Sequence, residues 1–385
     1  MLKRTPLYSA HQRLGGRLIE FGGWEMPVQY SGIVEEHLAV RQRAGLFDIS
    51  HMGELTASGP GAADFLNHTL TNDIRKLAIG QGQYTLLCNE RGGVVDDLYV
   101  YRVDADEFLM VVNASRIEAD WDWLQTQVDH APTRDGFQLR NASAEMGAVA
   151  VQGPAVAGFI DEAIPGGSMG CTMVPQVSAL QKNEVGAFVF RGASIYVART
   201  GYTGEDGFEV MAPAAAIESI WLALLESGHA AGIKPAGLGA RDTLRTEMGF
   251  PLYGHELNEH GTPLEAGLGV FVALEKGDFL GRAVMQQQKA TGLTRRCVAF
   301  RMTDKSPPPR PQYGLFLPGG SERIGEAVSG TQSPSLGVGI GLGYVPVAHA
   351  APGTAIEVEI RGRRYAARVE KKPLYRRPVA GAVQG

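Results

Sequence analysis

Glycine is the feature that most limits how this chain can fold. The sequence holds 50 glycines among 385 residues, and they are spread along its whole length. Dispersed glycines predict many tight turns between short elements, whereas a low-complexity segment would concentrate them. A chain of this length also exceeds one ordinary hydrophobic core, which predicts two or three domains.

Composition places the chain among globular proteins. Hydrophobic residues make up 44% and charged residues 20%, and no apolar run reaches the length of a membrane span. The basic pair Lys3 and Arg4 is followed by no apolar segment, so we expect no secretory signal and a cytoplasmic location. Cys88, Cys171 and Cys297 lie far apart without a zinc-ligand spacing, which predicts free thiols in a reducing compartment.

Charge is distributed unevenly. Residues 286–385 contain 15 Lys and Arg but six Asp and Glu, a net of +9, although the whole chain has a formal net charge of −5. This excess suggests an acidic partner or an anionic ligand for the C-terminal region, with a solvated basic surface as the simpler alternative. No DNA- or RNA-binding motif accompanies it, so we expect no nucleic-acid partner.

The strongest local pattern covers residues 92–102. Gly92 and Gly93 predict a turn, and the Val-, Leu- and Tyr-rich segment that follows predicts a strand. Two aspartates within a strand are unusual. Alternation would place Asp96 on one face with Val94, Leu98 and Val100, and Asp97 on the other with Val95, Tyr99 and Tyr101. A carboxylate among aromatic rings would have a raised pKa and could handle protons, which favours Asp97. The alternative is that both acids mark a strand end or a structural hydrogen bond.

Periodicity predicts the elements around this strand. We expect strands at 83–88, 94–103, 107–113, 148–152 and 194–200, and helices at 33–44, 217–225 and 277–290, with one more starting near 239. Ser115 and Glu118 match a capping box for a helix that carries Ile117, Trp121 and Leu124 on one side. From 295 to 372 only strands and turns are expected, which predicts a separate β-barrel.

Two further places in the chain have side chains suited to binding a ligand or a metal ion. Arg241 would lie in the first turn of its helix, where a cation gains nothing from the helix dipole, so either a ligand or an ion pair with Asp242 or Glu247 is expected. The second place holds three metal-ligating side chains, those of Asp48, His51 and Glu54. Their segment is predicted as strand and turn, so we expect no metal site there.

Several long motifs, in order along nearly the whole chain, resemble those of the aminomethyltransferases, the T-proteins of the glycine cleavage system. The motifs are Thr-Pro-Leu at 5–7, Phe-Asp-Ile-Ser-His-Met-Gly-Glu at 47–54, Gly-Gly-Val-Val-Asp-Asp-Leu at 92–98, Val-Gln-Gly-Pro at 151–154, Thr-Gly-Tyr-Thr-Gly-Glu-Asp-Gly-Phe-Glu at 200–209, Gly-Leu-Gly-Ala-Arg-Asp-Thr-Leu-Arg at 237–245 and Ser-Gly-Thr-Gln-Ser-Pro-Ser-Leu-Gly at 329–337.

The resemblance implies an α+β fold of three domains arranged as a ring, with two α+β domains and a C-terminal antiparallel β-barrel. The first domain would be discontinuous and comprise residues 1–50 and 140–245. The second, which would carry the folate site, would comprise 51–139 and 246–280. The barrel would comprise 281–385.

The resemblance also implies an activity. The family moves a one-carbon unit from the aminomethyl-loaded lipoyl arm of H-protein to tetrahydrofolate and releases ammonia, so tetrahydrofolate would be the co-substrate and lipoylated H-protein the partner. Carried over by motif, Asp97 is the catalytic residue, and Glu209 and Arg241 hold the pterin end of folate. The pocket would be lined by Tyr84, Tyr101, Asn113, Tyr202 and Met52. The sequence leaves open whether Asp97 orients the folate nitrogen, accepts its proton or stabilises an iminium-like charge.

The chain departs from the family pattern at two places. After Gly267-Leu268-Gly269 the family commonly has Trp, whereas this chain has Val270 followed by Phe271, and residues 307–311 are unusually rich in proline. The same fold serves folate-dependent demethylases of small methylated amines or sulfonium compounds, which is the alternative function. An iron–sulfur-assembly branch carries a cysteine motif after the Arg241 region, but residues 249–256 contain no cysteine.

Overall fold

The computed structural model describes residues 2–130 and 136–377. The chain separates into two compact units, each discontinuous in sequence. The first, here called the N-terminal unit, comprises Met1–Arg241, Leu257–Leu264 and Leu268–Gly292, and the second, the barrel unit, comprises Asp242–Glu256, Glu265–Gly267 and Leu293–Gly385. The finer division into the three domains expected from the sequence stays a prediction.

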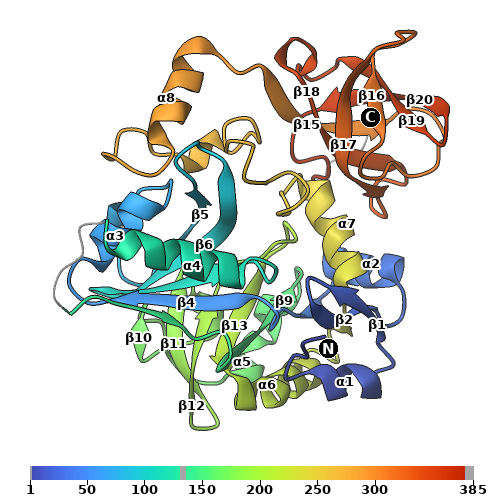
Figure 1. Ribbon diagram of the computed structural model, residues 1–385. Coiled ribbons are helices and arrows are strands. Elements are labelled where there is room, and N and C mark those ends of the chain that lie inside the picture. The colour runs from blue at the N-terminus through green and yellow to red at the C-terminus, as the bar shows by residue number, and fades with distance from the viewer. Residues whose placement is uncertain (1, 131–135, 378–385) are drawn as a thin grey trace. The chain divides into compact units, whose positions relative to one another are not determined.

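A seven-stranded sheet forms one half of the N-terminal unit, with strand order β10-β11-β12-β13-β9-β3-β14. Strand β14 runs parallel to β3, and the other neighbours are antiparallel. The strands are β3 (Gly45–Asp48), β9 (Met146–Gln152), β10 (Gly170–Cys171), β11 (Val185–Phe190), β12 (Ala193–Ala198), β13 (Gly207–Pro213) and β14 (Lys234–Pro235). Helices α5 (Ile160–Ala163) and α6 (Ala214–Ser227) pack on one face, where Ile217, Trp221 and Leu224 are fully buried (Figure 1).

A five-stranded antiparallel sheet forms the other half, with order β5-β6-β7-β4-β8. Its strands are β4 (Gly53–Ser58), β5 (Gly82–Cys88), β6 (Val94–Asp104), β7 (Glu107–Val112) and β8 (Gln138–Asn141). Helices α3 (Ala62–Thr69) and α4 (Ile117–Val128) cover one face and bury Phe65, Leu98 and Leu124 in a common core. The three strands predicted at 83–88, 94–103 and 107–113 are confirmed as β5, β6 and β7, which form a meander of neighbouring strands. The predicted capping box is wrong, because the N-cap of α4 is Arg116 and no side chain among the described residues caps the helix.

The segment before β3 is more regular than a loop. It contains α1 (Tyr8–Arg13), a hairpin of β1 (Arg17–Phe21) and β2 (Trp24–Gln29), and α2 (Ile33–Gln42). The C-cap of α2 is Arg43, and Gly45 begins β3. A side chain at Gly45 would meet Val40 Cγ2 at 2.4 Å, so its lack of a Cβ allows the strand to pass close to the helix.

The remaining helices follow β14. Helix α7 (Leu238–Met248) carries Arg241 in its first turn, as predicted, and α8 (Arg282–Thr291) overlaps the helix expected at 277–290. Short 3₁₀ turns lie at η1 (Ile74–Lys76), η2 (Val156–Gly158), η3 (Val177–Ala179), η4 (Gly269–Phe271) and η5 (Val347–His349). Among the described residues, no helix has the length and apolar character to span a membrane.

The barrel unit is a closed antiparallel barrel with order β15-β18-β17-β16-β19-β20. Its strands are β15 (Arg295–Met302), β16 (Gly314–Phe316), β17 (Arg323–Gln332), β18 (Gly339–Pro346), β19 (Ala355–Ile360) and β20 (Arg363–Glu370). Phe300, Leu315 and Val358 fill its centre, and Pro307, Pro308 and Pro309 lie outside the strands. The predicted α+β class with a C-terminal antiparallel barrel is confirmed.

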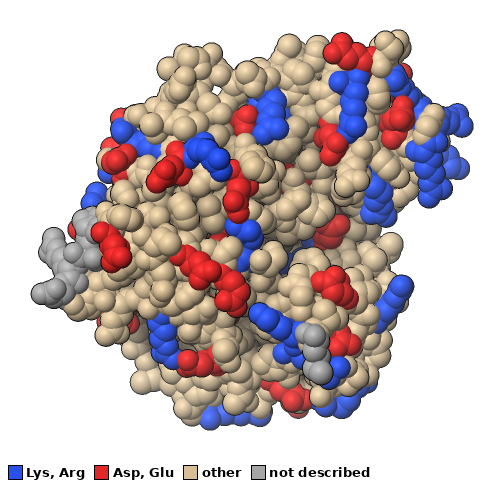
Figure 2. Space-filling model, viewed as in Figure 1, with Lys and Arg blue, Asp and Glu red and all other residues tan. Residues whose placement is uncertain are grey.

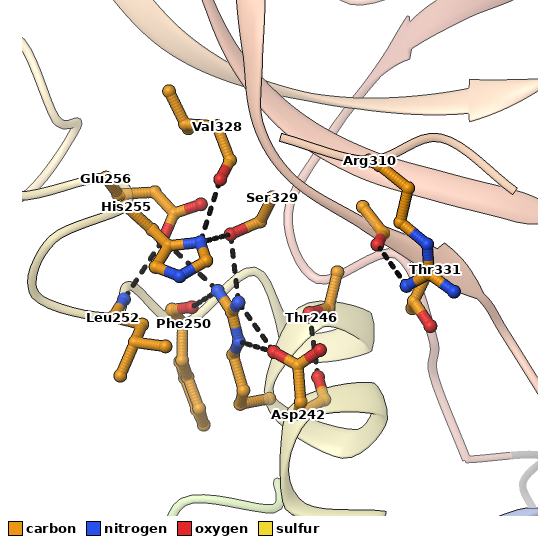
Figure 3. A network of polar contacts seen from close by, with 12 residues as sticks. Asp242, Thr246, Phe250, Leu252, His255, Glu256, Arg310, Val328, Ser329 and Thr331 are labelled. Carbon is orange, nitrogen blue, oxygen red and sulfur yellow. Dashed lines mark hydrogen bonds and ion pairs between the residues drawn. The ribbon is translucent and has the colours of Figure 1, made fainter. Parts of the chain in front are cut away.

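Arg245 ties the last turns of α7 to the barrel wall, and Figure 3 labels its partners Asp242, Glu256 and Ser329. Arg245 is 1% exposed, and it donates two hydrogen bonds to Asp242 Oδ1, one to Glu256 Oε2 and one to Ser329 Oγ on β17. A buried guanidinium needs this number of acceptors, because desolvation without them would be strongly unfavourable. Asp242 is therefore committed to Arg245.

Candidate active site

The two aspartates of β6 occupy different environments. Asp96 is fully buried, whereas Asp97 is half-buried and shares its face with Tyr99 and Tyr101, whose ring centroids lie 4.9 Å apart. The alternation predicted for the start of the strand is wrong at Val95. The pairing of β6 with β5 shifts register there, and Val95 packs in the same core as Leu98. Because the bulge precedes Asp96, the face predicted for Asp97 is unaffected.

Asn113, which directly follows β7, bridges the two carboxyl groups. Its backbone N–H donates to Asp96 Oδ2 at 2.9 Å, and its Nδ2 donates to Asp96 Oδ1 at 2.8 Å. The same Nδ2 donates to Asp97 Oδ1 at 2.9 Å and to the Asp97 carbonyl oxygen at 3.0 Å. One amide therefore fixes the relative positions of both acids, and Asp97 has little rotational freedom.

Tyr84 holds the other oxygen of Asp97. Its hydroxyl donates to Asp97 Oδ2 at 2.8 Å, and its ring meets Phe271 edge-on with centroids 4.6 Å apart. Val270, which stands where the family commonly has Trp, is 84% exposed. Phe271 therefore supplies the aromatic contact to Tyr84, while Val270 lies at the surface of the N-terminal unit.

The environment of Asp97 raises its pKa to about 7. Burial is the largest cause and the negative charge of Asp96 the second, and hydrogen bonds from Tyr84 and Asn113 only partly oppose them. An acid with a pKa near neutrality can both accept and return a proton at the pH of a cell. The arrangement therefore suits Asp97 to acid–base chemistry.

A second set of predicted residues lies around Glu209 on β13. Thr200 Oγ1 donates to Glu209 Oε2 at 2.6 Å, and the hydroxyls of Tyr101 and Thr200 are 2.9 Å apart. Glu209 belongs to the seven-stranded sheet and Tyr101 to the five-stranded sheet, so this chain of hydroxyl groups connects the two sheets of the N-terminal unit.

Arg241 completes this set. Its guanidinium carbon lies 4.7 Å from the centroid of the Tyr202 ring, within the range of a cation–π contact. Burial lowers the pKa of Arg241, and Tyr202 and Glu209 oppose that effect. The acidic partners considered in the sequence are engaged elsewhere, because Asp242 binds Arg245 and Glu247 accepts hydrogen bonds from Ser333 and Ser335.

Met52 lies in the turn between β3 and β4. It directly precedes Gly53, which pairs with Val112 on β7. Every predicted site residue thus belongs to the N-terminal unit. Charge effects link the two sets. Tyr202 raises the pKa of Tyr84, and Glu209 raises the pKa values of Tyr99 and Tyr101.

The metal-ligand interpretation of the 47–54 motif receives no support. Asp48 accepts hydrogen bonds from Thr5, His11 and Ser50. Burial lowers the pKa of His51 to about 4 and raises that of Glu54 to about 8. Over the described parts of the chain, no group of three or more His, Cys, Asp or Glu is arranged to hold a metal ion.

Sequence reasoning missed two contributors. Thr200 is the first residue of the family motif at 200–209, and its place in that motif was the available signal. Asp120 is fully buried against β6, and its signal was a carboxylate at helical spacing between Ile117 and Leu124 on an apolar face.

Comparison with known proteins identifies the family. Residues 7–276 match the family model of the GCVT N-terminal domain, and residues 295–376 match that of the glycine cleavage T-protein C-terminal barrel domain. The chain belongs to the T-protein family of aminomethyltransferases.

Relatives of this T-protein family match over nearly their whole length. An aminomethyltransferase of Symbiobacterium thermophilum is 47% identical over 380 residues, with 98% of each chain covered, and one of Bacillus cereus is 43% identical over 378 residues, with 98% and 99% covered. The crystal structure of the glycine cleavage system aminomethyltransferase T from Bartonella henselae superposes with a TM-score of 0.87 at 34% identity, covering 98% of this chain and 99% of that one.

Proposed function

We propose that this chain is the aminomethyltransferase of a glycine cleavage system, which moves the one-carbon unit of aminomethyl-dihydrolipoyl H-protein to tetrahydrofolate and releases ammonia. Membership of the family supports the reaction. The single observation that carries it to particular residues is Asp97, a carboxyl group with a pKa of about 7 that Tyr84 and Asn113 hold in place.

The role of Asp97 follows from the bond that must form. A folate nitrogen has to lose a proton as it bonds to the incoming carbon, and a base works best when its pKa lies near the working pH. The raised pKa of Asp97 favours proton acceptance over a purely orienting role. Its fixed position supports the same choice, because proton transfer requires the acceptor to be within hydrogen-bond distance.

Glu209 and Arg241 are suited to the other end of the ligand. A pterin ring presents an amide and an amino group along one edge, so a carboxylate can accept from its N–H groups and a guanidinium can donate to its carbonyl. Thr200 fixes the orientation of Glu209, and the Tyr202 ring supports Arg241. Tyr84, Tyr101 and Tyr202 provide aromatic surface for the flat ring.

Binding measurements test this assignment. Arg241→Ala and Glu209→Ala should each weaken tetrahydrofolate binding by roughly 2–5 kcal/mol, the usual cost of truncating a buried charged hydrogen bond. Arg75→Ala is the matched control, because Arg75 forms an exposed pair with Asp64 and should leave the affinity unchanged. Wild-type affinity of both site variants in titration calorimetry would exclude the pterin-edge role.

The carrier protein would dock through charge. Lys and Arg side chains gather on the visible face of the barrel unit (Figure 2), and the exposed basic residues of that unit include Arg361, Arg363, Arg368, Lys371, Lys372 and Arg376. An acidic H-protein would be attracted to this surface, and its apparent affinity should fall as salt rises, because exposed charges are screened beyond about 10 Å at 0.1 M. A salt-independent affinity would exclude a docking role for these residues.

One assay decides between the proposed activity and the demethylase alternative. The purified chain is mixed with tetrahydrofolate and aminomethyl-loaded H-protein, and ammonia and methylene-tetrahydrofolate are measured together. The proposal expects both products in equal amounts and none when H-protein is omitted. Formation of a folate product from a small methylated amine or sulfonium compound, without H-protein, would favour the alternative.

A further inference from the structure

A buried acid on α4 lies directly behind the active-site aspartates. Asp120 is fully buried on the face of α4 that also buries Ile117 and Leu124. Neither of its carboxyl oxygens accepts a hydrogen bond from a donor among the described residues. Its carboxyl group lies within hydrogen-bonding reach of Asp96 on β6.

Two carboxylates in contact in the protein interior cannot both be ionised, because like charges repel strongly there and neither has a proton to donate. A single proton shared between them removes both problems. Burial raises the pKa of Asp96 as well, but Asp96 accepts two hydrogen bonds from Asn113, which stabilise its ionised form. Asp120 accepts none from the described residues. The proton therefore belongs on Asp120, and burial together with the Asp96 charge raises the pKa of Asp120 to about 11.

We propose that Asp120 is a positioning residue for Asp97: as a neutral carboxylic acid it donates a hydrogen bond to Asp96, and it thereby keeps Asp96 ionised, Asn113 oriented and a negative charge beside Asp97. The proposal rests on the function assigned to Asp97 above. No covalent step is involved, and the proton on Asp120 stays in place during turnover.

The charged groups around Asp120 are few. Asp96 and Asp97 face it from β6 and disfavour its ionisation, and Arg116 at the start of the same helix favours it. Arg116 is itself committed, because it donates to the Val95 carbonyl oxygen and to Glu259. The two aspartates outweigh this arginine, so the neutral form of Asp120 persists through the pH range in which Asp97 titrates.

The first test detects the proton directly. Infrared difference spectra of the ligand-free protein, with aspartate carboxyl groups labelled with ¹³C, should show a protonated carboxyl band at pH 8 that is absent in Asp120→Asn. This measurement needs no turnover. Absence of the band in the wild-type protein at pH 8, or its persistence in Asp120→Asn, would overturn the proposal.

The second test uses the pH dependence of turnover. Asp120→Leu removes the donor, so Asp96 should take up a proton and lose its charge, and the acid limb of kcat/KM should move to lower pH by about one unit. Asp120→Asn retains an N–H donor, so its acid limb should stay at the wild-type position. Asp122→Asn, which removes an exposed carboxylate from the same helix, is the control for a change in surface charge.

The comparison of Asp120→Leu with Asp120→Asn shows whether Asp120 is neutral and whether it positions Asp97. If Asp120 were ionised in the wild-type protein, Asp120→Asn would also remove a negative charge and would move the acid limb downward. An unmoved limb in Asp120→Leu would show that Asp120 has a structural role alone. Should Asp120→Leu fail to fold, NMR titration of labelled Asp97 in ligand-free wild-type protein and Asp120→Asn gives the same decision: equal pKa values support the proposal, and a lower pKa in the variant overturns it.

The NMR and infrared measurements also separate this inference from the proposed function. A protonated Asp120 together with a titrating Asp97 in a protein that transfers no aminomethyl group would refute the function and leave the acid pair standing. Active enzyme without the protonated band would refute the acid pair alone.

Discussion

Asp48 and Asp97 are both aspartates of the N-terminal unit, the first buried and the second half-buried, yet their pKa values move in opposite directions. Burial acts to raise both. At Asp48, hydrogen bonds from His11, Thr5 and the Ser50 backbone N–H outweigh burial and lower the pKa. At Asp97, the negative charge of Asp96 adds to burial and raises the pKa to about 7.

The difference lies in what surrounds each group. A carboxylate supplied with three donors, as at Asp48, is held in one charge state and contributes to the fold. A carboxylate beside another acid, as at Asp97, has a pKa near neutrality and can change its charge state. Such an arrangement does not favour the stability of the fold. The same contrast occurs at Glu54, six residues after Asp48, where no donor reaches either oxygen among the described residues and burial raises the pKa to about 8.

Replacing Asp97 should have the largest effect. Asp97→Asn keeps the shape but cannot take up a proton, so turnover should fall by a factor on the order of 10² to 10⁴ while folate binding survives. In the wild-type enzyme, turnover should decline as pH falls below about 7, as Asp97 becomes protonated. Steady-state rates against pH, with folate affinity measured in parallel, check both expectations.

Asp96→Asn is the matched variant for this prediction. It removes the charge that raises the pKa of Asp97, so the acid limb should move to lower pH and turnover should fall less than in Asp97→Asn. If Asp96→Asn abolished turnover and Asp97→Asn left it intact, the roles of the two aspartates would be reversed.

Replacing Asp48 should affect the stability of the fold and not turnover. Asp48→Asn should lower the free energy of unfolding by about 2–4 kcal/mol at pH 7, since it disrupts a buried charged network. Because the folded-state pKa of Asp48 is lowered, the stability that it contributes is present above the unfolded pKa of about 3.9 and is lost as pH falls through the folded value. Urea unfolding at pH 7 and below pH 3 tests this, and an equal difference at both pH values would contradict it.

The contrast between Asp96 and Asp97 was predictable in part from the sequence. Period-two alternation places Asp97 with Tyr99 and Tyr101, because side-chain direction in a strand is a local property. The bulge at Val95 was not predictable. It occurs where Gly93 passes so close to the Glu259 backbone that a Cβ would lie 1.9 Å from its carbonyl oxygen, and a contact so distant in sequence leaves no local pattern.

The partners of each acid were also beyond sequence reasoning. Asn113 follows the third strand of the meander, and its link to both aspartates depends on the pairing of β6 with β7. The capping-box pattern at Ser115 describes a local preference, and it failed because the N-cap of α4 is Arg116. Family motifs supplied Glu209 and Arg241, whose places in β13 and α7 come together only through the fold.

Glu54 should show a pH dependence opposite to that of Asp48. Its folded-state pKa is raised to about 8, so the folded state binds more protons than the unfolded state between about pH 4.5 and 8, and stability falls as pH rises across that window. Glu54→Gln mimics the neutral acid and should be more stable than wild type at pH 8 by about 1–3 kcal/mol, with little difference at pH 5. Thermal unfolding at both pH values measures this, and a pH-independent difference would contradict it.

An exposed pair in the same unit should show the smallest effect. Asp64 and Arg75 approach to 2.8 Å, but their side chains are 33% and 54% exposed, so water and salt screen the charges that burial would strengthen. A double-mutant cycle with Asp64→Asn and Arg75→Ala should give a coupling of at most about 1 kcal/mol, and it should decrease further at high salt. Because this pair and Asp48 belong to one unit, the same unfolding measurement serves both. A salt-insensitive coupling as large as the effect of Asp48→Asn would contradict this expectation. It would show that burial does not explain why Asp48 contributes more to stability than Asp64.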